Sequence, residues 1–556
     1  MEDSTTRCQR ALSPKRLCVN VFTMNAINSK LFPIHFDRPT TDAAEIATKF
    51  YRLAQVRFGM YTVCGCVDGT LIKLDARKTN EAQVVDRADN RSINCMVIFR
   101  EKPCACWGYE DGCESCTNYS MFSCPHDSGG WTKSKKEQIQ LFFEQGDFGY
   151  VREKRSTLKE LCSSTSKEGA SLECSEYMTF CRGKKIWLDV RHLVNRTDNL
   201  RYKMDVLNPG NIGGYCRWDT SKENHLDHKS PLQSWSPELQ NFIPLSQDPF
   251  SSGECDVMFE KPVIIMKLDA QVSMYHHFCD FFNLYASLHV NNSHPNTFTT
   301  DVHIILWESY PYRSSFAPAW KAFTKYPVKT IKDYEGNRLC FHNIMLPLLP
   351  RMIFGLYYNT PLVYGCQRSG LFHAFNRFML HRLGVPLRKH FDPSNIHVVL
   401  LSRKTKHRNI INEDELLDAL KLEEGITVTR VEYSWHTDFL WQVKTTHTAD
   451  VFIGIHGSGL THLLFLPDWA VIFELYNCED EGCYKDLARL RGVEYITWED
   501  PSKVFPNDKD RHPEVAAHAK FTNYAFEVKE FLRLVHKAIA MVKASANHDK
   551  PMHNEL

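Results

Sequence analysis

The C-terminal part of the chain alternates short apolar runs with amphipathic stretches. Four apolar runs have the length of strands, at residues 396–401, 426–431, 450–454 and 470–475. Between them, apolar residues recur at helical spacing, for example over residues 413–422. Regular alternation of apolar strands with helices is typical of a doubly wound parallel sheet. We therefore predict an α/β fold for this part of the chain.

The region before it follows a similar pattern. Residues 262–266 and 302–307 are apolar runs of strand length, and a helix is expected after Met274. Two such regions in succession predict two Rossmann-like halves that face a cleft. We assign residues 256–385 to the first half and residues 386–545 to the second.

Residues 99–255 form a Cys-rich N-terminal segment in front of these halves. Zinc sites usually contain tandem Cys-x2-Cys pairs, and only Cys113 and Cys116 have that spacing. Disulfides are therefore favoured over zinc, although the spacing does not reveal their pairing. The early cysteines are Cys104, Cys106, Cys113, Cys116, Cys124, Cys162, Cys174, Cys181, Cys216 and Cys255.

Charge and hydropathy exclude several classes of partner. The formal net charge is +1, which gives no general attraction to nucleic acid or to an anionic membrane. No apolar run approaches the roughly 20 residues of a membrane-spanning helix, and residues 1–24 contain no convincing signal peptide.

The end of the chain points to a compartment. The last four residues, His553-Asn554-Glu555-Leu556, are close to the KDEL-type signal read by the retrieval receptor of the endoplasmic reticulum. Asn-x-Ser/Thr tripeptides at Asn118, Asn195 and Asn291 suit the same lumen. We expect residues 546–556 to be a tail with this retrieval signal, and the protein to reside in the lumen.

The first 98 residues differ from the rest. An apolar strand ends at Asp68-Gly69-Thr70, and residues 90–94 read Asn-Arg-Ser-Ile-Asn. Both features resemble Harbinger-type transposases, in which the residue matching Asp68 is a metal-binding carboxylate. A two-metal nuclease needs further carboxylates to bind its metal ions. The sequence after Ile98 does not continue the transposase pattern that would contain them. We interpret residues 1–98 as a transposase-like fragment or an artefactual extension.

A glycine-rich turn carries the strongest chemical signal. A buried strand is expected to end at Gly454, and a helix is expected to follow the turn. Glycines let backbone N–H groups approach a phosphate, and a helix N-terminus adds a favourable dipole. The residues of this turn that we expect to bind a nucleotide diphosphate are His456, Gly457, Ser458, Gly459, Thr461 and His462.

Two other strand ends supply polar candidates. Arg403, Arg408 and Asn409 follow the strand at 396–401, and a guanidinium group matches the geometry of phosphate. Glu474 ends the strand at 470–475, where a carboxylate can accept hydrogen bonds from ribose hydroxyls. A solvated or capping role is the simpler alternative for each.

His276, His277 and Asp280 are the candidate acid–base residues. They lie at the expected start of a helix, with Asp280 about one turn after the two histidines. Adjacent histidines on a helix point in different directions, which argues against a shared zinc ion. A structural histidine remains the alternative, and the sequence does not select among the three residues.

From Cys104 onward the chain resembles glycosyltransferase family 61, and within it the branch that acts on EGF domains. The resemblance covers more than four-fifths of the chain. It rests on stretches that include Cys106–Tyr109, Asp147–Tyr150, Ser230–Trp235, Met274–Asp280, Leu349–Met352, Tyr358–Pro361, Gly454–Trp469, Phe473–Asp480, Leu487–Gly492 and the C-terminal tail.

The resemblance implies a GT-B-like fold and an inverting enzyme that moves GlcNAc from UDP-GlcNAc to Ser or Thr. The implied acceptors are folded EGF-like domains of Notch-like and matrix proteins. Vertebrate members carry Asp-Tyr-Asp where this chain has Lys325-Tyr326-Pro327, so no metal-binding triplet is expected there. No cofactor is firmly required, although a divalent metal is compatible with the resemblance.

Three other functions compete with this one. A family-61 enzyme could use another acceptor, such as O-mannosyl glycans, or another sugar. A non-catalytic binding factor retained in the endoplasmic reticulum would not need the glycine turn, Arg403 or Glu474. A transposase would need acidic partners that the sequence after residue 98 does not show.

Overall fold

The computed structural model of the chain separates into two compact units. The first unit comprises residues 1–105 and 115–117 and the second comprises residues 106–114 and 118–556. In the first unit, β1 (Leu71–Lys73) and β2 (Ser92–Asn94) pair as antiparallel strands. The structure describes residues 71–73, 92–94, 122–164, 169–193, 207–208, 210–219, 233–291, 297–308, 311–350, 364–388, 390–507 and 519–548.

Several predictions fall on other parts of the chain. Most of the transposase-like region, the cysteines from Cys104 to Cys116, Asn118, Asn195 and the C-terminal tetrapeptide lie outside the described residues. The fold and the site below belong to the second unit alone.

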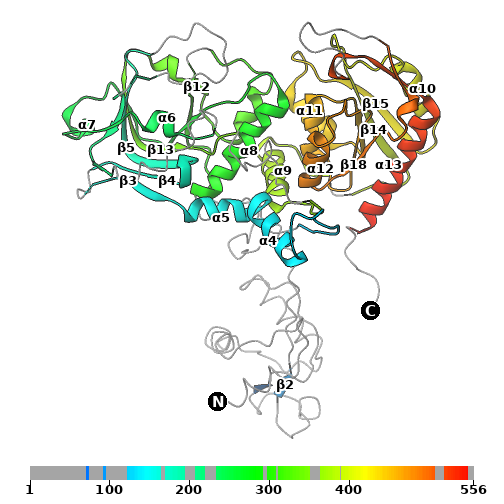
Figure 1. The fold of residues 1–556 in the computed structure, drawn as a ribbon, viewed down its shortest axis with the longest axis horizontal. Coiled ribbons are helices and arrows are strands. Elements are labelled where there is room, and N and C mark those ends of the chain that lie inside the picture. Colours follow the sequence, from blue (N-terminus) through cyan, green and yellow to red (C-terminus); the bar gives the residue numbers. More distant parts are fainter. Residues whose placement is uncertain are drawn as a thin grey trace, which may run out of the picture. The chain divides into compact units, whose positions relative to one another are not determined.

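The first half is built on a mixed sheet of eleven strands (Figure 1). Its strand order is β12-β11-β10-β13-β5-β4-β3-β7, in which β10 to β13 run parallel and β5 joins β13 antiparallel. The strands are β3 (Lys159–Ser163), β4 (Ser171–Cys174), β5 (Cys181–Asp189), β6 (Ile212–Gly214), β7 (Arg217–Trp218), β8 (Phe242–Pro244), β9 (Val257–Phe259), β10 (Val263–Met266), β11 (His303–Leu306), β12 (Lys329–Thr330) and β13 (Arg338–Leu346).

The predicted boundary at residue 255 runs through this sheet. β5, from the Cys-rich segment, pairs with β13 along most of its length. A disulfide between Cys255 and Cys340 also joins the two segments. The Cys-rich segment and the first Rossmann-like half are therefore one folding unit.

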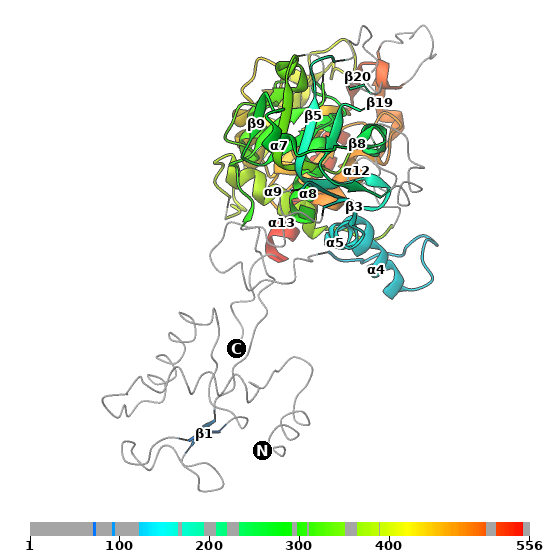
Figure 2. The same ribbon diagram turned by 90° about the vertical axis from the view of Figure 1, so that its left-hand side faces the viewer.

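Four disulfides confirm the disulfide interpretation for the early cysteines that the structure describes, whereas Cys279, Cys478 and Cys483 are free. Besides Cys255–Cys340, they are Cys124–Cys366, Cys162–Cys216 and Cys174–Cys181. Cys124–Cys366 joins residues 242 positions apart and ties the segment before α4 (Lys135–Gly146) to the segment before α9 (Gly370–Arg382). In Figure 2, α4 lies beside α5 (Phe148–Ser156), and the two helices contact each other.

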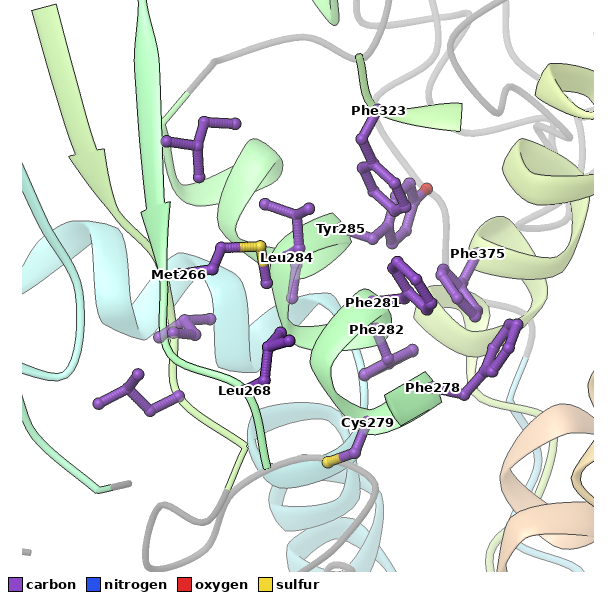
Figure 3. Packing of buried hydrophobic residues seen from close by; sticks show 14 of the residues in the cluster. Met266, Leu268, Phe278, Cys279, Phe281, Phe282, Leu284, Tyr285, Phe323 and Phe375 are labelled. Atoms are coloured by element: carbon purple, nitrogen blue, oxygen red, sulfur yellow. The ribbon is translucent and has the colours of Figure 1, made fainter. Parts of the chain in front are cut away.

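The helix α8 (Met274–Asn291) is the centre of the hydrophobic core. Apolar residues occupy most of its surface, and Phe278, Phe281, Phe282 and Tyr285 are fully buried. Figure 3 shows these aromatic rings gathered between α8 and Phe375 of α9. Fourteen of its eighteen residues are buried, including the polar His277, Asp280 and Asn283, so α8 lies inside the molecule.

Two arginines close the C-terminal end of α8. Arg155 donates hydrogen bonds to the carbonyls of His289 and Val290, and Arg182 donates to that of Asn291 at 2.9 Å. Cations stabilise a helix C-terminus because they satisfy its last carbonyls and oppose its dipole. Arg155 and Arg182 therefore fix the helix from the end farthest from His276 and His277.

The second half contains a five-stranded, fully parallel sheet in the order β15-β14-β16-β17-β18. Its elements are β14 (Ile396–Ser402), α10 (Glu413–Lys421), β15 (Ile426–Glu432), α11 (Phe439–His447), β16 (Val451–Gly454), η9 (Ser458–Phe465), β17 (Val471–Glu474), α12 (Cys483–Arg491), β18 (Glu494–Thr497) and α13 (Val528–His548).

Helices cover both faces of this sheet, as the alternation along β14 requires. Val398 and Leu400 pack with Leu416 of α10 and Phe531 of α13. Val399 and Leu401, on the other face, belong to the large core that includes α8 and η9. The predicted doubly wound sheet and the GT-B-like α/β class are confirmed.

Shorter elements complete the second unit. They are η4 (Glu176–Met178), α6 (Ser236–Leu239), α7 (Pro249–Ser252), η7 (Ala317–Ala322), η8 (Ile331–Tyr334), η10 (Pro501–Lys503), β19 (Val504–Pro506), η11 (Ala519–Phe521) and β20 (Tyr524–Phe526).

One buried carboxylate holds two helices by their N-termini. Asp147 is fully buried, and it accepts hydrogen bonds from the N–H groups of Phe148, Gly370 and Leu371 at 2.8, 3.2 and 3.1 Å. Removing it in Asp147→Ala leaves those donors buried without this acceptor. We expect a loss of about 2–4 kcal/mol in the free energy of unfolding, measured by urea denaturation with the disulfides intact.

Asp500→Ala is the matched control. Asp500 caps η10 through the N–H of Ser502, and its carboxylate is exposed. We expect this variant to lose less than about 1 kcal/mol. Equal losses in the two variants would contradict the role assigned to Asp147.

Candidate active site

The candidate site lies where the order of the second sheet changes direction. From β14 the chain first adds β15 on one side of the sheet and then β16 on the other. The loops after β14 and β16 therefore separate at the carboxyl edge, which is where doubly wound sheets bind their ligands. Arg403 begins the first loop and the glycine-rich turn forms the second.

The glycines of the turn are required by close packing. A Cβ atom on Gly454 would lie 2.9 Å from Cδ2 of Leu460, and one on Gly459 would lie 2.8 Å from Cδ2 of Leu401. These two glycines let η9 pack directly against the end of β14. The helix predicted after the turn is of the 3₁₀ type and eight residues long.

Gly457 has a different neighbour. A Cβ atom there would lie 2.4 Å from Nη1 of Arg403 and 3.8 Å from Nη1 of Arg408. The two guanidinium groups therefore converge on the backbone of the turn, as the sequence predicted for a phosphate site.

Arg403 and Arg408 bring two positive charges together. Arg403 Nε donates to the carbonyl of His407 at 3.1 Å, and Arg408 Nη1 donates to that of His456 at 3.1 Å. Within the described ranges, neither arginine forms an ion pair with a carboxylate, and the buried Nε of Arg408 has no hydrogen-bond partner. Burial, together with the charge of Arg408, lowers the pKa of Arg403 to about 10.

The pair is held despite a backbone cost. Arg408 has a φ of 61°, a left-handed conformation that favours glycine. Its N–H donates to the carbonyl of Thr522 at 2.9 Å, which fixes that conformation. Two neighbouring cations with no carboxylate partner in the described residues, supported by a strained backbone, indicate a site for an anion.

The N-terminus of η9 adds to this preference. No side chain caps it, and Ser458 is partly exposed at its first position. Backbone N–H groups at a helix start attract anions through their orientation and through the helix dipole. The turn and the two arginines together are suited to a diphosphate.

His456 is oriented by Glu474. Its Nδ1 lies 2.8 Å from Oε1 of Glu474, whose Oε2 accepts a hydrogen bond from the Tyr495 hydroxyl at 2.6 Å. The Nε2 atom of His456 lies 3.9 Å from Asp480. Glu474 is fully buried, and both of its carboxylate oxygens are hydrogen-bonded within the protein, where it orients His456. Its contact with ribose hydroxyls stays a prediction.

Three further residues predicted to bind the donor, Asn409, Thr461 and His462, have side chains that are buried or hydrogen-bonded within the protein. Asn409 is used within its own loop, because its side chain bonds the N–H and the carbonyl of Thr405 at 3.0 and 2.6 Å. Thr461 is fully buried, and within the described residues its hydroxyl has no hydrogen-bond partner.

His462 is also inside the protein. It is 1% exposed, its Nδ1 bonds the carbonyl of Gly459 at 2.8 Å, and its ring lies 4.4 Å from that of Tyr433. Burial lowers the pKa of His462 to about 4, so the ring is neutral at physiological pH. The side chains of Asn409 and His462 are thus hydrogen-bonded within the protein, and that of Thr461 is buried.

The structure separates the two adjacent histidines of α8. His276 is partly exposed, and its Nδ1 lies 2.6 Å from Oδ2 of Asp269. His277 is fully buried between Asp280 at 3.1 Å and the Tyr312 hydroxyl at 2.8 Å, and burial lowers its pKa to about 3. His277 therefore stays neutral and cannot reach a substrate directly.

Asp280 supports the same arrangement from inside. It is 1% exposed, and its Oδ1 accepts the N–H of Asp269 at 2.9 Å. Of the three predicted acid–base residues, only His276 has an exposed side chain. The carboxylate that orients it, Asp269, was missed by the sequence analysis; its position three residues after β10 was the available signal.

Aromatic contacts bring the two halves together at this place. Tyr275, beside His276, lies 5.8 Å from Tyr484 of α12, and Tyr484 lies 5.2 Å from His456. Phe278 of α8 packs on Phe439 and Phe465 of the second half at 5.8 and 5.5 Å. A chain of aromatic contacts across the two halves therefore links the first turn of α8 to His456, whose carbonyl accepts from Arg408.

The segment that replaces the vertebrate acidic triplet lies elsewhere. Lys325 and Tyr326 both bind Asp301, at 2.9 and 2.6 Å, and Asp301 precedes the amino end of β11. Parallel strands carry their ligands at the opposite, carboxyl edge. Lys325-Tyr326-Pro327 is therefore a surface ion-pair cluster distant from the edge that carries His276.

The described ranges hold no cluster of three or more His, Cys, Asp or Glu residues arranged to bind a metal. In the same residues, no helix combines the length and the apolar character needed to cross a bilayer.

A two-sheet α/β fold with a basic, glycine-rich turn at the switch point of a parallel sheet is typical of enzymes that bind nucleotide-linked substrates. The family model for glycosyltransferase 61 matches residues 274–473, a range that contains His276, Arg403, Arg408 and the glycine-rich turn and ends one residue before Glu474.

Curated relatives extend the match over most of the chain. The EGF domain-specific O-linked N-acetylglucosamine transferase of Drosophila melanogaster is 51% identical over 462 residues, which cover 81% of this chain and 88% of the relative. The proteins of the same name from Mus musculus and Gallus gallus are 47% and 46% identical and are covered to 85% and 81%. The chain belongs to the family of EGF domain-specific O-linked N-acetylglucosamine transferases.

The arginine pair predicts a measurable response to anions. Inorganic pyrophosphate should raise the thermal unfolding midpoint, because a ligand that binds only the folded state adds about 2.7 kcal/mol at roughly 100 times its Kd. Arg403→Met and Arg408→Met should each lose most of this effect. Arg430→Met is the control, since Arg430 lies on β15, is partly exposed and is paired with Asp414. Equal stabilisation of all four proteins would refute the anion site.

Proposed function

We propose that this enzyme transfers N-acetylglucosamine from UDP-GlcNAc to a Ser or Thr hydroxyl of a folded EGF-like domain, with inversion at the anomeric carbon. The observation that carries the proposal is the arginine pair at the sheet's switch point, combined with the Asp269–His276 pair from the other half. The names of the relatives support the sugar and the acceptor.

The acceptor side of the reaction is assigned to His276. Asp269 holds Nδ1 as the hydrogen-bonded nitrogen, so that Nε2 is the atom to accept a proton. As the acceptor oxygen forms its bond to C1 of GlcNAc, its proton moves to this Nε2. A base within hydrogen-bond reach of the attacking hydroxyl contributes typically about 10²–10⁴-fold to the rate.

The donor side is assigned to the second half. When the bond between C1 and the β-phosphate oxygen breaks, its electron pair and a negative charge stay on UDP. Arg403, Arg408 and the N-terminus of η9 surround the place where we put that charge. Fixed charges of this kind favour the transition state because they need no reorganisation during the reaction.

The arginines supply positive charge that a divalent metal supplies in other transferases. We therefore propose that the reaction proceeds without a metal ion, and that added EDTA leaves the rate unchanged.

Disulfides and the tail support a location in the lumen of the endoplasmic reticulum. The second unit contains four disulfides, three of which join residues 54 to 242 positions apart, and disulfides persist in an oxidising compartment. The C-terminal His-Asn-Glu-Leu sequence is suited to the KDEL-type retrieval receptor. The proposed acceptors there are EGF repeats of Notch-like and matrix proteins on their way to the surface.

A transfer assay tests the function directly. The purified full chain is mixed with a folded EGF domain and UDP-GlcNAc, UDP-GalNAc or UDP-glucose in parallel, and the acceptor is weighed by mass spectrometry. We expect one N-acetylhexosamine on the acceptor with UDP-GlcNAc alone. Transfer of another sugar, or transfer only to an O-mannosyl glycan, would assign a different family-61 activity. No transfer to either acceptor would leave a binding factor.

His276→Ala tests the base. We expect kcat to fall by about 10²–10⁴-fold while the KM for UDP-GlcNAc changes little, because the donor contacts lie in the other half. His536→Ala is the control, since His536 is exposed on α13 and paired with Glu423. An unchanged kcat in His276→Ala would remove His276 from the mechanism.

A further inference from the structure

The loop that follows β17 carries a carboxylate beside His456. Asp480 comes after Glu474, the last residue of β17, and its side chain is 36% exposed. Its Oδ2 lies 2.7 Å from Nζ of Lys520 in η11 and 3.9 Å from Nε2 of His456. Unlike Glu474, which is fully buried, Asp480 is therefore open to a ligand that enters from solvent.

The Nε2 atom of His456 faces this carboxylate without bonding it. The His456 side chain is only 6% exposed, and its Nδ1 is bonded to Glu474 at 2.8 Å. Among the described residues, Nε2 has no hydrogen-bond partner, because the 3.9 Å to Asp480 exceeds the length of a hydrogen bond. A ring that is more than nine-tenths buried and leaves one nitrogen without a partner indicates that a polar atom from outside the protein binds there.

The two groups select the chemistry of that ligand. Because the Glu474 carboxylate accepts the hydrogen on Nδ1, Nε2 of His456 keeps its lone pair and is an acceptor. The Asp480 carboxylate is an acceptor too, and it offers about four lone-pair positions, so the bond from Lys520 leaves others for a ligand. Two neighbouring acceptors fit two neighbouring O–H donors, whereas phosphate oxygens only accept. The pair therefore fits a vicinal diol.

The place for this diol adjoins the arginine pair. The carbonyl of His456 accepts a hydrogen bond from Arg408 at 3.1 Å. The next residue is Gly457, on which Arg403 and Arg408 converge. A ligand that bonds the arginines and the ring of His456 therefore carries its diol close to its phosphate groups.

The sheet topology favours the ribose of the nucleotide as the source of the diol. β17 lies beside β16, with Glu474 opposite Gly454, so the loop that carries Asp480 leaves the sheet next to the glycine-rich turn. In dinucleotide-binding folds, the diphosphate lies on the glycine turn, and an acidic residue about 20 positions further on bonds the ribose hydroxyls. Asp480 follows Gly457 at a similar separation.

Backbone hydrogen bonds fix the position of this carboxylate. The N–H of Asp480 donates to the carbonyl of Asn477 at 3.0 Å, and the side chain of Asn477 accepts the N–H of Glu479 at 3.1 Å. The N–H of His456 donates to the carbonyl of Tyr476 at 3.2 Å, which joins this loop to the glycine-rich turn. Groups that are held in place before binding lose little conformational entropy when a ligand arrives.

We propose that Nε2 of His456 and the carboxylate of Asp480 bind the vicinal hydroxyls of the ribose of the sugar nucleotide. This inference rests on the proposed function, because it adds the nucleoside contacts to the same donor site. The arginine pair then binds the diphosphate, Lys520 positions Asp480, and Glu474 acts by orienting His456. The donor is thus recognised as a ribonucleotide.

Calorimetric titration of the full chain with UDP, 2′-deoxy-UDP and 3′-deoxy-UDP tests the proposal. We expect each deoxynucleotide to bind the wild-type protein about tenfold more weakly than UDP, since each has lost one hydrogen bond to an acceptor of the site. In Asp480→Ala, the difference from UDP should disappear for one of the two deoxynucleotides. In His456→Gln, it should disappear for the other.

Inorganic pyrophosphate separates hydrogen bonding from charge. Asp480→Ala removes a negative charge from the neighbourhood of the arginine pair, so pyrophosphate should bind this variant at least as tightly as the wild type. UDP should bind it about tenfold more weakly. Glu481→Ala is the matched control, because it removes an exposed carboxylate from the next position of the same loop. It should keep the wild-type preference for UDP over both deoxynucleotides.

The outcomes distinguish this inference from the function on which it rests. If the wild-type protein binds neither UDP nor pyrophosphate, the donor site is refuted and both proposals fail. If it prefers UDP as expected but transfers no sugar, only the proposed function fails. If it binds UDP and both deoxynucleotides equally, only the ribose contact is refuted.

Two further results would assign the diol elsewhere. If the preference for UDP persists in both Asp480→Ala and His456→Gln, another group, such as Glu474, holds the ribose. If Asp480→Ala weakens the binding of UDP-GlcNAc but not that of UDP, the hydroxyls belong to the transferred sugar. Either result overturns the proposal.

Discussion

The mutual repulsion of Arg403 and Arg408 is the constraint from which the site follows. Two guanidinium groups that converge on Gly457 raise each other's electrostatic energy, and burial adds to that cost. Within the described residues no carboxylate relieves it. The fold nevertheless holds both groups in place, through the carbonyls of His407 and His456 and the left-handed backbone at Arg408. This arrangement costs stability in the free protein, and the anion that we propose to bind there would offset the repulsion between the two arginines.

In the first half, the position of the proposed base depends on the helix α8. Its core side chains fix it against α9, and Arg155 and Arg182 fix its C-terminus, so the position of its first turn is set by contacts far from the chemistry. That turn places His276 at the surface and His277 inside. The bonds from Asp280 to the backbone of Asp269 and from Asp269 to His276 then transmit the position of the buried helix to the exposed ring. The position of the His276 ring is thus set by the packing of the hydrophobic core.

Much of the fold could be predicted because its strands and helices follow from the local periodicity of apolar residues. The strands at 396–402 and 471–474 and the helix at 413–421 are short-range patterns, and the structure gives them nearly the predicted bounds. The pairing of β5 with β13 is a contact between distant segments, and no local pattern encodes it, so the boundary at residue 255 was placed inside a sheet. Disulfide pairing could not be predicted either, because it also depends on contacts between distant segments.

The site was predictable in its residue types but not in their roles. Arg403, Arg408 and His456 follow strand ends, and a parallel sheet brings strand ends together whatever the side chains do. Whether Glu474 faces a ligand or a histidine depends on Tyr495, which lies on the neighbouring strand, and the sequence contains no sign of that contact. His276 and His277 are the same residue type in the sequence. In the structure, His276 contacts Asp269 near the surface, and His277 contacts Tyr312 in the core. Roles of this kind are decided by tertiary contacts, which a sequence read one residue at a time does not contain.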